Sequence, residues 1–271
     1  MKNPWLIAVV NLLSVIIVLF VNYASQVQLW GAPAIGSISN EFTNLVTPAS
    51  YAFAIWGPIF LGLLVFCIYS FYRIIKYGKE QAFLFQSLPW FFLANACNAL
   101  WVYCFTLRMY GLSVLLMLIL LISLLQLIRK FDMEIWDAPI GTIAFIWWPI
   151  SLYAGWVAVA TVVNIGLYLE SLGWTGAPLN PTAWTIVMLV IVTILNAYLV
   201  QKRNLREFAG VAVWALVAIG FRHIEAIPVI AYVAWSGAGL LGLLILRHGF
   251  INRRTNPFEK LRQRLSNNRQ A

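Results

Sequence analysis

Residues 110–130 read YGLSVLLMLILLISLLQLIRK, an apolar run of membrane-spanning length that ends in two basic residues. A bilayer core about 30 Å thick is crossed by about 20 mostly apolar residues in a helix. The apolar residues of this run are continuous and do not alternate with a period of two, so they predict a helix and not a strand of a barrel. Backbone groups inside lipid must also be paired within the protein, as a helix pairs them. We therefore expect a transmembrane helix here.

The rest of the chain repeats this pattern. Of its 271 residues, 62% are hydrophobic and 10% are charged, and the mean hydropathy is +0.83, which is outside the range of soluble domains. The predicted spans are 5–22, 50–74, 87–107, 110–128, 140–166, 184–201, 208–222 and 227–247. We therefore predict an all-α, polytopic transmembrane helix bundle of about eight helices. The span 208–222 is short and is followed by Arg222, His223 and Glu225, so a tight hairpin or a partly re-entrant segment is the alternative there.

The basic residues test this layout, because Lys and Arg accumulate in short cytoplasmic loops. With the N-terminus inside, every Lys and Arg except Arg108 and Arg222 falls in an inner segment. The net charge of +9 is therefore mostly a topology signal, and nucleic-acid binding is the weaker interpretation of the basic tail after Phe250. The run from Trp5 to Phe20 exceeds the core of a usual signal peptide, so we expect it to be uncleaved. These features predict a multi-pass protein of a bacterial-type plasma membrane with both termini cytoplasmic and no nucleic-acid partner.

Side chains suited to catalysis or metal binding are missing from the predicted membrane interior. The nine carboxylates fall in loops or at span ends, and no lysine lies at a helix centre. Cys67, Cys97 and Cys104 lie within spans without a C-x-x-C motif, and His223 and His248 lie at helix ends, far apart in sequence. Acid/base or covalent catalysis needs a titratable or nucleophilic group in place. We therefore predict no catalytic residues and no metal site, and we favour a protein that is not an enzyme.

Amides and aromatic rings occupy the predicted membrane interior instead. Three groups of them stand at the start of the second span, in the third span and in the fifth: Tyr51, Phe53 and Trp56; Asn98 and Trp101; and Tyr153, Trp156, Ala160 and Asn164. The spacings of three and four residues place the members of the second and third groups on one face of their helix. Rings with a small gap and an amide suit a planar apolar ligand. They also suit close helix packing, which spacing alone slightly favours.

These motifs resemble those of the TspO/MBR family, the translocator and tryptophan-rich sensory proteins. The family's second helix begins with a proline-rich aromatic signature, and residues 48–56 look like a variant of it. Its third helix carries an N-A-L-W-like motif, present at residues 98–101, and its fifth a Y-x-x-W-x-x-x-A-x-x-x-N pattern, present at residues 153–164. The sequence departs from the family where Leu152 replaces the proline expected before the tyrosine, and where Tyr51 replaces the usual tryptophan.

The resemblance implies an organisation for the chain. Family members typically end after five helices, so this chain would belong to a long, divergent branch. We expect a TspO-like five-helix transmembrane bundle over residues 1–168, additional C-terminal transmembrane helices over 169–250 and a basic cytoplasmic tail over 251–271. The loop 23–49 is expected to be a lid over the bundle, whereas the loop 167–183 is either a second lid or a simple connector with interfacial tryptophans.

The resemblance also implies a function. It is that of a membrane-embedded binding, sensing or transport protein for a planar hydrophobic ligand, a tetrapyrrole or sterol-like molecule, held by the nine residues of the three groups. No cofactor is predicted, but a porphyrin or haem-type tetrapyrrole fits the expected ligand. The implied partners are the lipid bilayer, the hydrophobic small molecule and a second copy of the chain in a homodimer. A membrane enzyme acting on lipid or tetrapyrrole, and a structural or assembly factor for membrane proteins, are the alternatives.

Overall fold

The computed structural model describes residues 3–42, 44–78 and 81–252, and in these ranges the chain is helical without a strand. The long helices are α1 (Pro4–Gln26), α3 (Trp56–Tyr77), α5 (Trp90–Thr106), α6 (Tyr110–Lys130), α8 (Trp148–Ser171), α9 (Pro181–Arg203), α10 (Arg206–His223) and α11 (Pro228–Ile251). The short elements are α2 (Ile35–Glu41), η1 (Ser50–Ile55), α4 (Ala82–Ser87), α7 (Ile140–Thr142) and η2 (Ile143–Trp147). The prediction of an all-α helix bundle is confirmed. The predicted tail, 251–271, lies outside the described residues from residue 253 on.

Six helical segments of the described chain are long and apolar enough to cross a membrane: Pro4–Gln26, Ser50–Tyr77, Tyr110–Lys130, Ile140–Ser171, Pro181–Arg203 and Pro228–Ile251. The other two expected spans are also helices, but α5 has only 17 residues and α10 carries Arg206, Glu207 and Arg222 within 18. Because α10 is one continuous helix, the hairpin alternative for 208–222 is wrong. Leucines along the outer side of α11, such as Leu240 and Leu243, are more than 60% exposed, as suits contact with lipid. The chain is an integral, multi-pass membrane protein.

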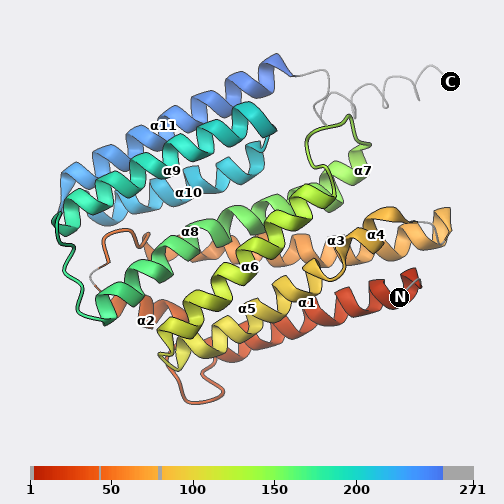
Figure 1. The fold of residues 1–271 in the computed structure, drawn as a ribbon, viewed down its shortest axis with the longest axis horizontal. Coiled ribbons are helices and arrows are strands. Elements are labelled where there is room, and N and C mark those ends of the chain that lie inside the picture. Colours follow the sequence, from red (N-terminus) through yellow and green to blue (C-terminus); the bar gives the residue numbers. More distant parts are fainter. Residues whose placement is uncertain (1–2, 43, 79–80, 253–271) are drawn as a thin grey trace.

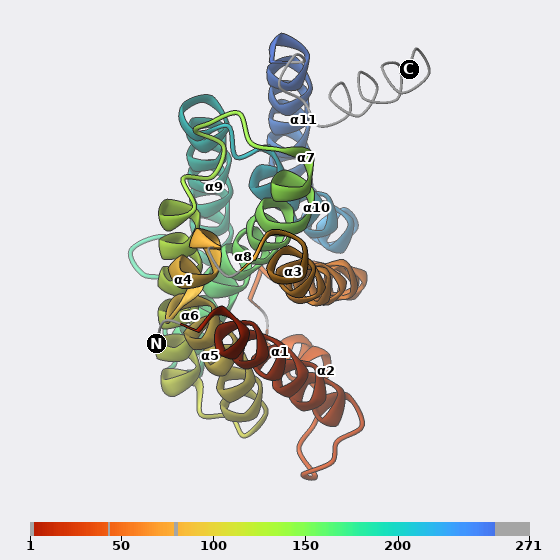
Figure 2. The same ribbon diagram turned by 90° about the vertical axis from the view of Figure 1, so that its right-hand side faces the viewer.

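The first five long helices form a closed ring. Around it, α1 contacts α3, α3 contacts α8, α8 contacts α6, α6 contacts α5 and α5 returns to α1 (Figures 1 and 2). Buried amides join α1 to its neighbours: Asn11 donates to Ser87 at 3.0 Å, and Asn95 donates to Ser14 at 2.9 Å. Hydrogen bonds of this kind hold helices together where lipid supplies no hydrophobic driving force. Asn11 and Asn95 therefore act as contacts between helices.

The last three long helices, α9, α10 and α11, pack on one another and lie on one side of the five-helix ring (Figures 1 and 2). Only α10 makes an extensive contact with the ring, along α8. The two helices approach closely at Gly155, where an added Cβ would lie 2.8 Å from the backbone oxygen of Phe208. On α11, the small residues Ala234 and Ala238 are buried inside this unit, so they pack within the chain.

A proline shapes the start of α8. Residues Ile143–Trp147 form one π-helical turn directly before Trp148 and Pro149. Proline lacks the backbone N–H that an α-helix needs at that position, so the regular hydrogen-bond ladder is interrupted. A Cβ added to Gly62 of α3 would lie only 3.2 Å from Pro149, so α3 and α8 cross closely here. This crossing sets the position of the stripe that follows on α8, formed by Tyr153, Trp156, Ala160 and Asn164.

Candidate ligand-binding site

A small central cavity lies inside the five-helix ring, at the end of the bundle where α2 lies. Residues of all three predicted groups line it: Phe53, Trp56, Trp101, Trp156, Ala160 and Asn164. Ile35 and Ser39 of α2 and Pro48 line the cavity as well. We call residues 31–49, which include α2 and run to the start of η1, the lid segment. The structure thus brings the predicted helix faces together beneath the predicted lid.

Trp156 meets two other aromatic rings of the central cavity nearly at right angles. The ring of Trp156 lies 5.9 Å from that of Phe53 and 6.5 Å from that of Trp56, at interplanar angles of 85° and 86°. Trp56 also stacks on Phe60 at 5.1 Å and meets the fully buried Tyr153 edge-on at 6.1 Å. Edge-to-face pairs of this kind are favourable beyond the area that they bury. The rings therefore form a defined cage, with Tyr153 behind its wall.

The polar groups of the cage are mostly engaged with one another. The indole N–H of Trp101 donates to Asn164 Oδ1 at 3.2 Å, and Asn164 Nδ2 donates to the hydroxyl of Ser113 at 3.0 Å. By contrast, Nε1 of Trp156 is buried and has no hydrogen-bond partner among the described residues. A buried donor without a partner is costly. Trp156 therefore offers a buried donor that is free for a ligand.

Three predicted site residues do not line the central cavity: Tyr153 lies behind its wall, and Tyr51 and Asn98 lie away from it. Tyr51 packs edge-on against Trp214 and Phe221 of α10, with ring centroids 5.4 and 6.4 Å apart, and it is 43% exposed. Asn98 is fully buried and accepts a hydrogen bond from Asn22 of α1 at 3.1 Å. Both side chains join helices in this structure, as the packing alternative predicts.

A side cavity of about 610 Å³ adjoins the central one, between α1, α3 and α2. Ile35, Phe53 and Trp56 line both, so these side chains form the partition between them. The central cavity itself measures only about 30 Å³. Ligand pockets usually measure about 300 to 1,000 Å³. Of these two, the side cavity is therefore the one of ligand size while the partition is closed.

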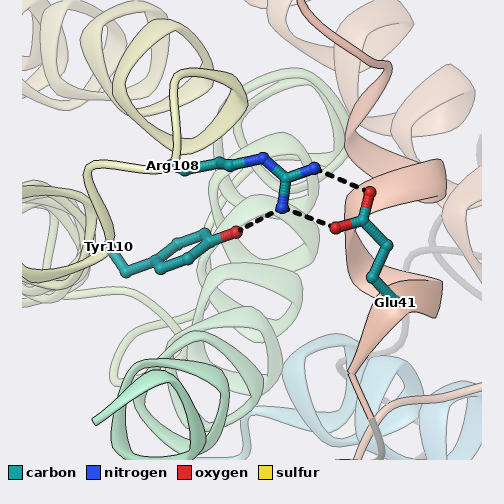
Figure 3. A network of polar contacts seen from close by, with 3 residues as sticks. All are labelled: Glu41, Arg108 and Tyr110. Atoms are coloured by element: carbon teal, nitrogen blue, oxygen red, sulfur yellow. Dashed lines mark hydrogen bonds and ion pairs between the residues drawn. The ribbon is translucent and has the colours of Figure 1, made fainter.

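An ion pair holds one part of the lid segment. The guanidinium of Arg108, in the turn between α5 and α6, donates to both carboxylate oxygens of Glu41 at 2.6 and 2.9 Å, and to the hydroxyl of Tyr110 at 3.5 Å (Figure 3). The hydrogen bond from Arg108 holds the pKa of Glu41 below its usual value. Nearby, the indole of Trp30 donates to Thr106 at 3.1 Å. The lid segment is thus fastened to the end of α5.

Helix α10 holds the other part of the lid segment. A ring nitrogen of His223 lies 2.9 Å from the backbone oxygen of Leu45, and the backbone N–H of Ala49 donates to Ala218 at 3.2 Å. Just beyond the lid segment, the indole of Trp214 donates to the backbone oxygen of Ala52 at 3.0 Å. Helix α10, one of the additional C-terminal helices, therefore holds the chain that leads into Phe53 and Trp56 by hydrogen bonds.

One comparison with known proteins identifies the family. The family model described as TSPO-like protein matches residues 8–247. This chain belongs to the TSPO-like protein family. No curated protein and no solved structure gives a significant match. Because the match runs through α9, α10 and most of α11, it includes the additional helices as well as the five-helix ring. Membership makes the chain a membrane protein of the binding, transport or sensing kind.

The contents of this TSPO-like site limit its chemistry. Among the described residues, no His, Cys or Met lines the central or the side cavity, and Tyr23 of the side cavity is the one side chain there of a type that ligates haem iron. Within the described ranges, no three His, Cys, Asp or Glu side chains gather where they could hold a metal ion. A tetrapyrrole does not fit the central cavity as it stands, because about 30 Å³ has room for only one or two waters. The central cavity offers flat rings and the indole N–H of Trp156, and the side cavity adds polar side chains such as Asn22, Gln26 and Ser50.

Some residues that line the TSPO-like site were not predicted from the sequence. Ile35 and Ser39 belong to a short helix in a loop, and Phe105 lies one turn beyond Trp101 on α5. The spacing of Trp101 and Phe105, four residues, is a signal that could have added Phe105 to its group. The grip of α10 on the lid segment depends on tertiary contacts between distant parts of the chain, which no local pattern encodes.

Proposed function

We propose that this TSPO-like protein binds a planar apolar small molecule where the central and side cavities meet, under the lid segment. The cage of perpendicular rings around the unpartnered N–H of Trp156 is the observation that carries the proposal. Rings give flat walls for a planar molecule, and the N–H would donate to one acceptor on it. A ligand that accepted this bond would relieve the cost of a buried, unpaired donor.

The ligand class follows from the two cavities. The side cavity, about 610 Å³, is large enough for a tetrapyrrole or sterol-like molecule. Rotation of Phe53 and Trp56, which form the partition, would join it to the central cavity and expose Trp156. Because no described His, Cys or Met lines the site, recognition would rest mainly on the flat face of the molecule, with or without a metal. A planar macrocycle is therefore our first choice and a sterol the second.

The contacts of the lid segment support sensing over transport. A ligand that pushed Phe53 and Trp56 apart would also displace the neighbouring backbone, which is hydrogen-bonded to His223 and Trp214 of α10. Movement at the site would thus reach the three-helix unit. Among the described residues, no Asp, Glu, Lys, Arg or His lines the two cavities, so this proposal includes no group of these types that would couple transport to protons. In this proposal the additional helices report whether the site is filled.

The setting of the protein also belongs to this proposal. We place it in a bacterial-type plasma membrane with both termini cytoplasmic, because basic residues gather in alternate connections. In support, the N-terminus and the C-terminal end of α11 lie at the same end of the bundle (Figure 1). The homodimer rests on family resemblance, since the small residues of α11 are used within the chain.

The test is a titration of the protein in lipid nanodiscs with protoporphyrin IX, followed by the fluorescence of the porphyrin. We expect saturable binding at one porphyrin per chain and competition by a sterol. Porphyrin that partitions without saturation would contradict the proposal and favour a structural role. Mass spectrometry of the recovered porphyrin separates binding from catalysis, because an enzyme would return an altered molecule.

A further inference from the structure

A second large cavity lies outside the five-helix ring, between α8 and α9. It measures about 610 Å³, and Leu45 and Val46 of the lid segment form one of its walls. We call it the lateral cavity. It exists because α10, and not α9, packs along α8, which leaves a gap beside the last turns of α8. Its size is within the usual range for ligand pockets.

The walls of the lateral cavity are fixed by local contacts. Asn44 donates from its side chain to the backbone oxygen of Val163 at 2.9 Å and accepts from the N–H of Val46 at 3.1 Å. Gly166 makes room for it, since an added Cβ would lie 2.6 Å from Asn44 Nδ2. On the opposite wall, Trp184 donates its indole N–H to the backbone oxygen of Gly176. The cavity is therefore preformed, which lowers the entropic cost of binding.

The lateral cavity is lined by apolar side chains between α8 and α9 and by one carboxylate near the end of α8. Ile165 and Leu169 of α8 and Met188 of α9 supply apolar surface. Trp174 and Trp184 meet at 5.7 Å beside the helix ends, where tryptophans mark the interface between lipid tails and headgroups. Among the described residues of the lining, Glu170 is the one ionisable side chain. An anionic headgroup would be repelled there and a cationic one attracted.

We propose that the lateral cavity is a second binding site, for an amphipathic molecule with an apolar body and a cationic amine head. The body lies along Ile165, Leu169 and Met188, between α8 and α9. The amine head lies at the interface beside Glu170. This site is separate from the central cage and does not depend on the function proposed for it.

The test uses three photoreactive probes with the same alkyl chain and diazirine but an amine, alcohol or carboxylate head, added to the protein in phosphatidylcholine nanodiscs. We expect saturable labelling of α8 and α9 by the amine, with the alcohol binding about threefold to fivefold more weakly, as one partly exposed charge pair allows. The carboxylate should bind most weakly. Glu170→Gln should bring the amine to the affinity of the alcohol.

Two further variants test the location. Met188→Trp fills the cavity and should abolish saturable labelling, whereas Val187→Trp, whose side chain points out and is 37% exposed, should label as the parent does. If Met188→Trp does not fold, Glu170→Gln still decides. Equal binding of the amine and the alcohol by the parent, or labelling that does not saturate, would overturn the proposal. Porphyrin binding by Glu170→Gln should stay unchanged, so the two sites are tested separately.

Discussion

Glu41 and Arg108 face each other across the open end of the five-helix ring, joined by two hydrogen bonds of 2.6 and 2.9 Å. Glu41 ends α2, which covers the central cavity, and Arg108 lies in the turn between α5 and α6. The two residues are 67 positions apart in the sequence, and both side chains are partly exposed to solvent. It is therefore placed to act as a latch that water and salt can reach.

The first prediction concerns this latch. The hydrogen bond from Arg108 lowers the pKa of Glu41 below its usual value of 4.5, so the carboxylate stays charged to a lower pH. The latch is thus complete at neutral pH and is lost as the pH falls through the lowered pKa. A nitroxide on Ser37→Cys, an exposed position on α2, should become more mobile over that acid range. The native cysteines are buried, so labelling is selective.

The variant Glu41→Gln serves as the matched test of the latch. It should show the mobile nitroxide spectrum already at pH 7 and lose the acid transition. Glu225→Gln, an exposed carboxylate in another loop at the same end, should behave as the parent does. An acid transition that persists in Glu41→Gln would assign it to a different group.

The second prediction concerns the grip of α10 on the chain beyond the lid segment. Trp214→Phe removes the indole bond to Ala52 but keeps a ring against Tyr51. The loss of one such bond should lower the free energy of unfolding by about 1 kcal/mol. It should also speed porphyrin association, measured by stopped-flow fluorescence. Trp235→Phe removes a comparable indole bond to Val217 within the three-helix unit and should leave the association rate unchanged.

The third prediction concerns the contact between the two helical units. A Cβ at Gly155 would lie 2.8 Å from the backbone oxygen of Phe208, and backbone cannot move aside cheaply. Gly155→Ala should therefore separate α8 from α10 and lower the melting temperature in detergent. Gly210→Ala is the control, because a Cβ there meets nothing within 4 Å. Equal melting temperatures for the two variants would show that α8 and α10 do not pack closely.

Much of the fold could be predicted from sequence because each helix is encoded locally. The expected spans are all helices, since apolar runs and flanking charges are properties of single segments. Six of them are long and apolar enough to cross a membrane. Of the other two, α5 has only 17 residues and α10 carries three charged residues. Their neighbours in the bundle shield them, which no single segment reveals.

The candidate site could be predicted only in part. Helical spacing placed Trp156, Ala160 and Asn164 on one face of α8, and the structure puts all three on the central cavity. Spacing carries no information on which polar groups already have partners, and Asn164, a predicted ligand-binding residue, hydrogen-bonds to Trp101 and Ser113. Tyr51 packs against Trp214 of α10, a helix outside the five-helix ring, and the local motif carries no information on that contact.

The fourth prediction concerns topology. Reporter fusions at residues 40, 80, 175 and 271 should report outside, inside, outside and inside, because the basic residues gather in alternate connections. Glu41 and Arg108 then lie outside, and the bond from Asn204 to Glu134, 2.8 Å long, lies inside. A C-terminus that reports outside would refute this arrangement.

The last prediction concerns the cage itself. Trp156→Phe keeps an apolar ring but removes the unpartnered N–H, so porphyrin affinity should fall by about threefold to tenfold while stability hardly changes. Ala160→Phe should block binding by filling the space beside the stripe. Trp5→Phe is the matched control, since Trp5 is 39% exposed and packs on Phe71 instead of lining the central cavity. Equilibrium titrations in nanodiscs and melting temperatures are measured together. If Trp156→Phe and Ala160→Phe lower the melting temperature yet bind porphyrin as tightly as Trp5→Phe does, the cage serves helix packing and the ligand binds elsewhere.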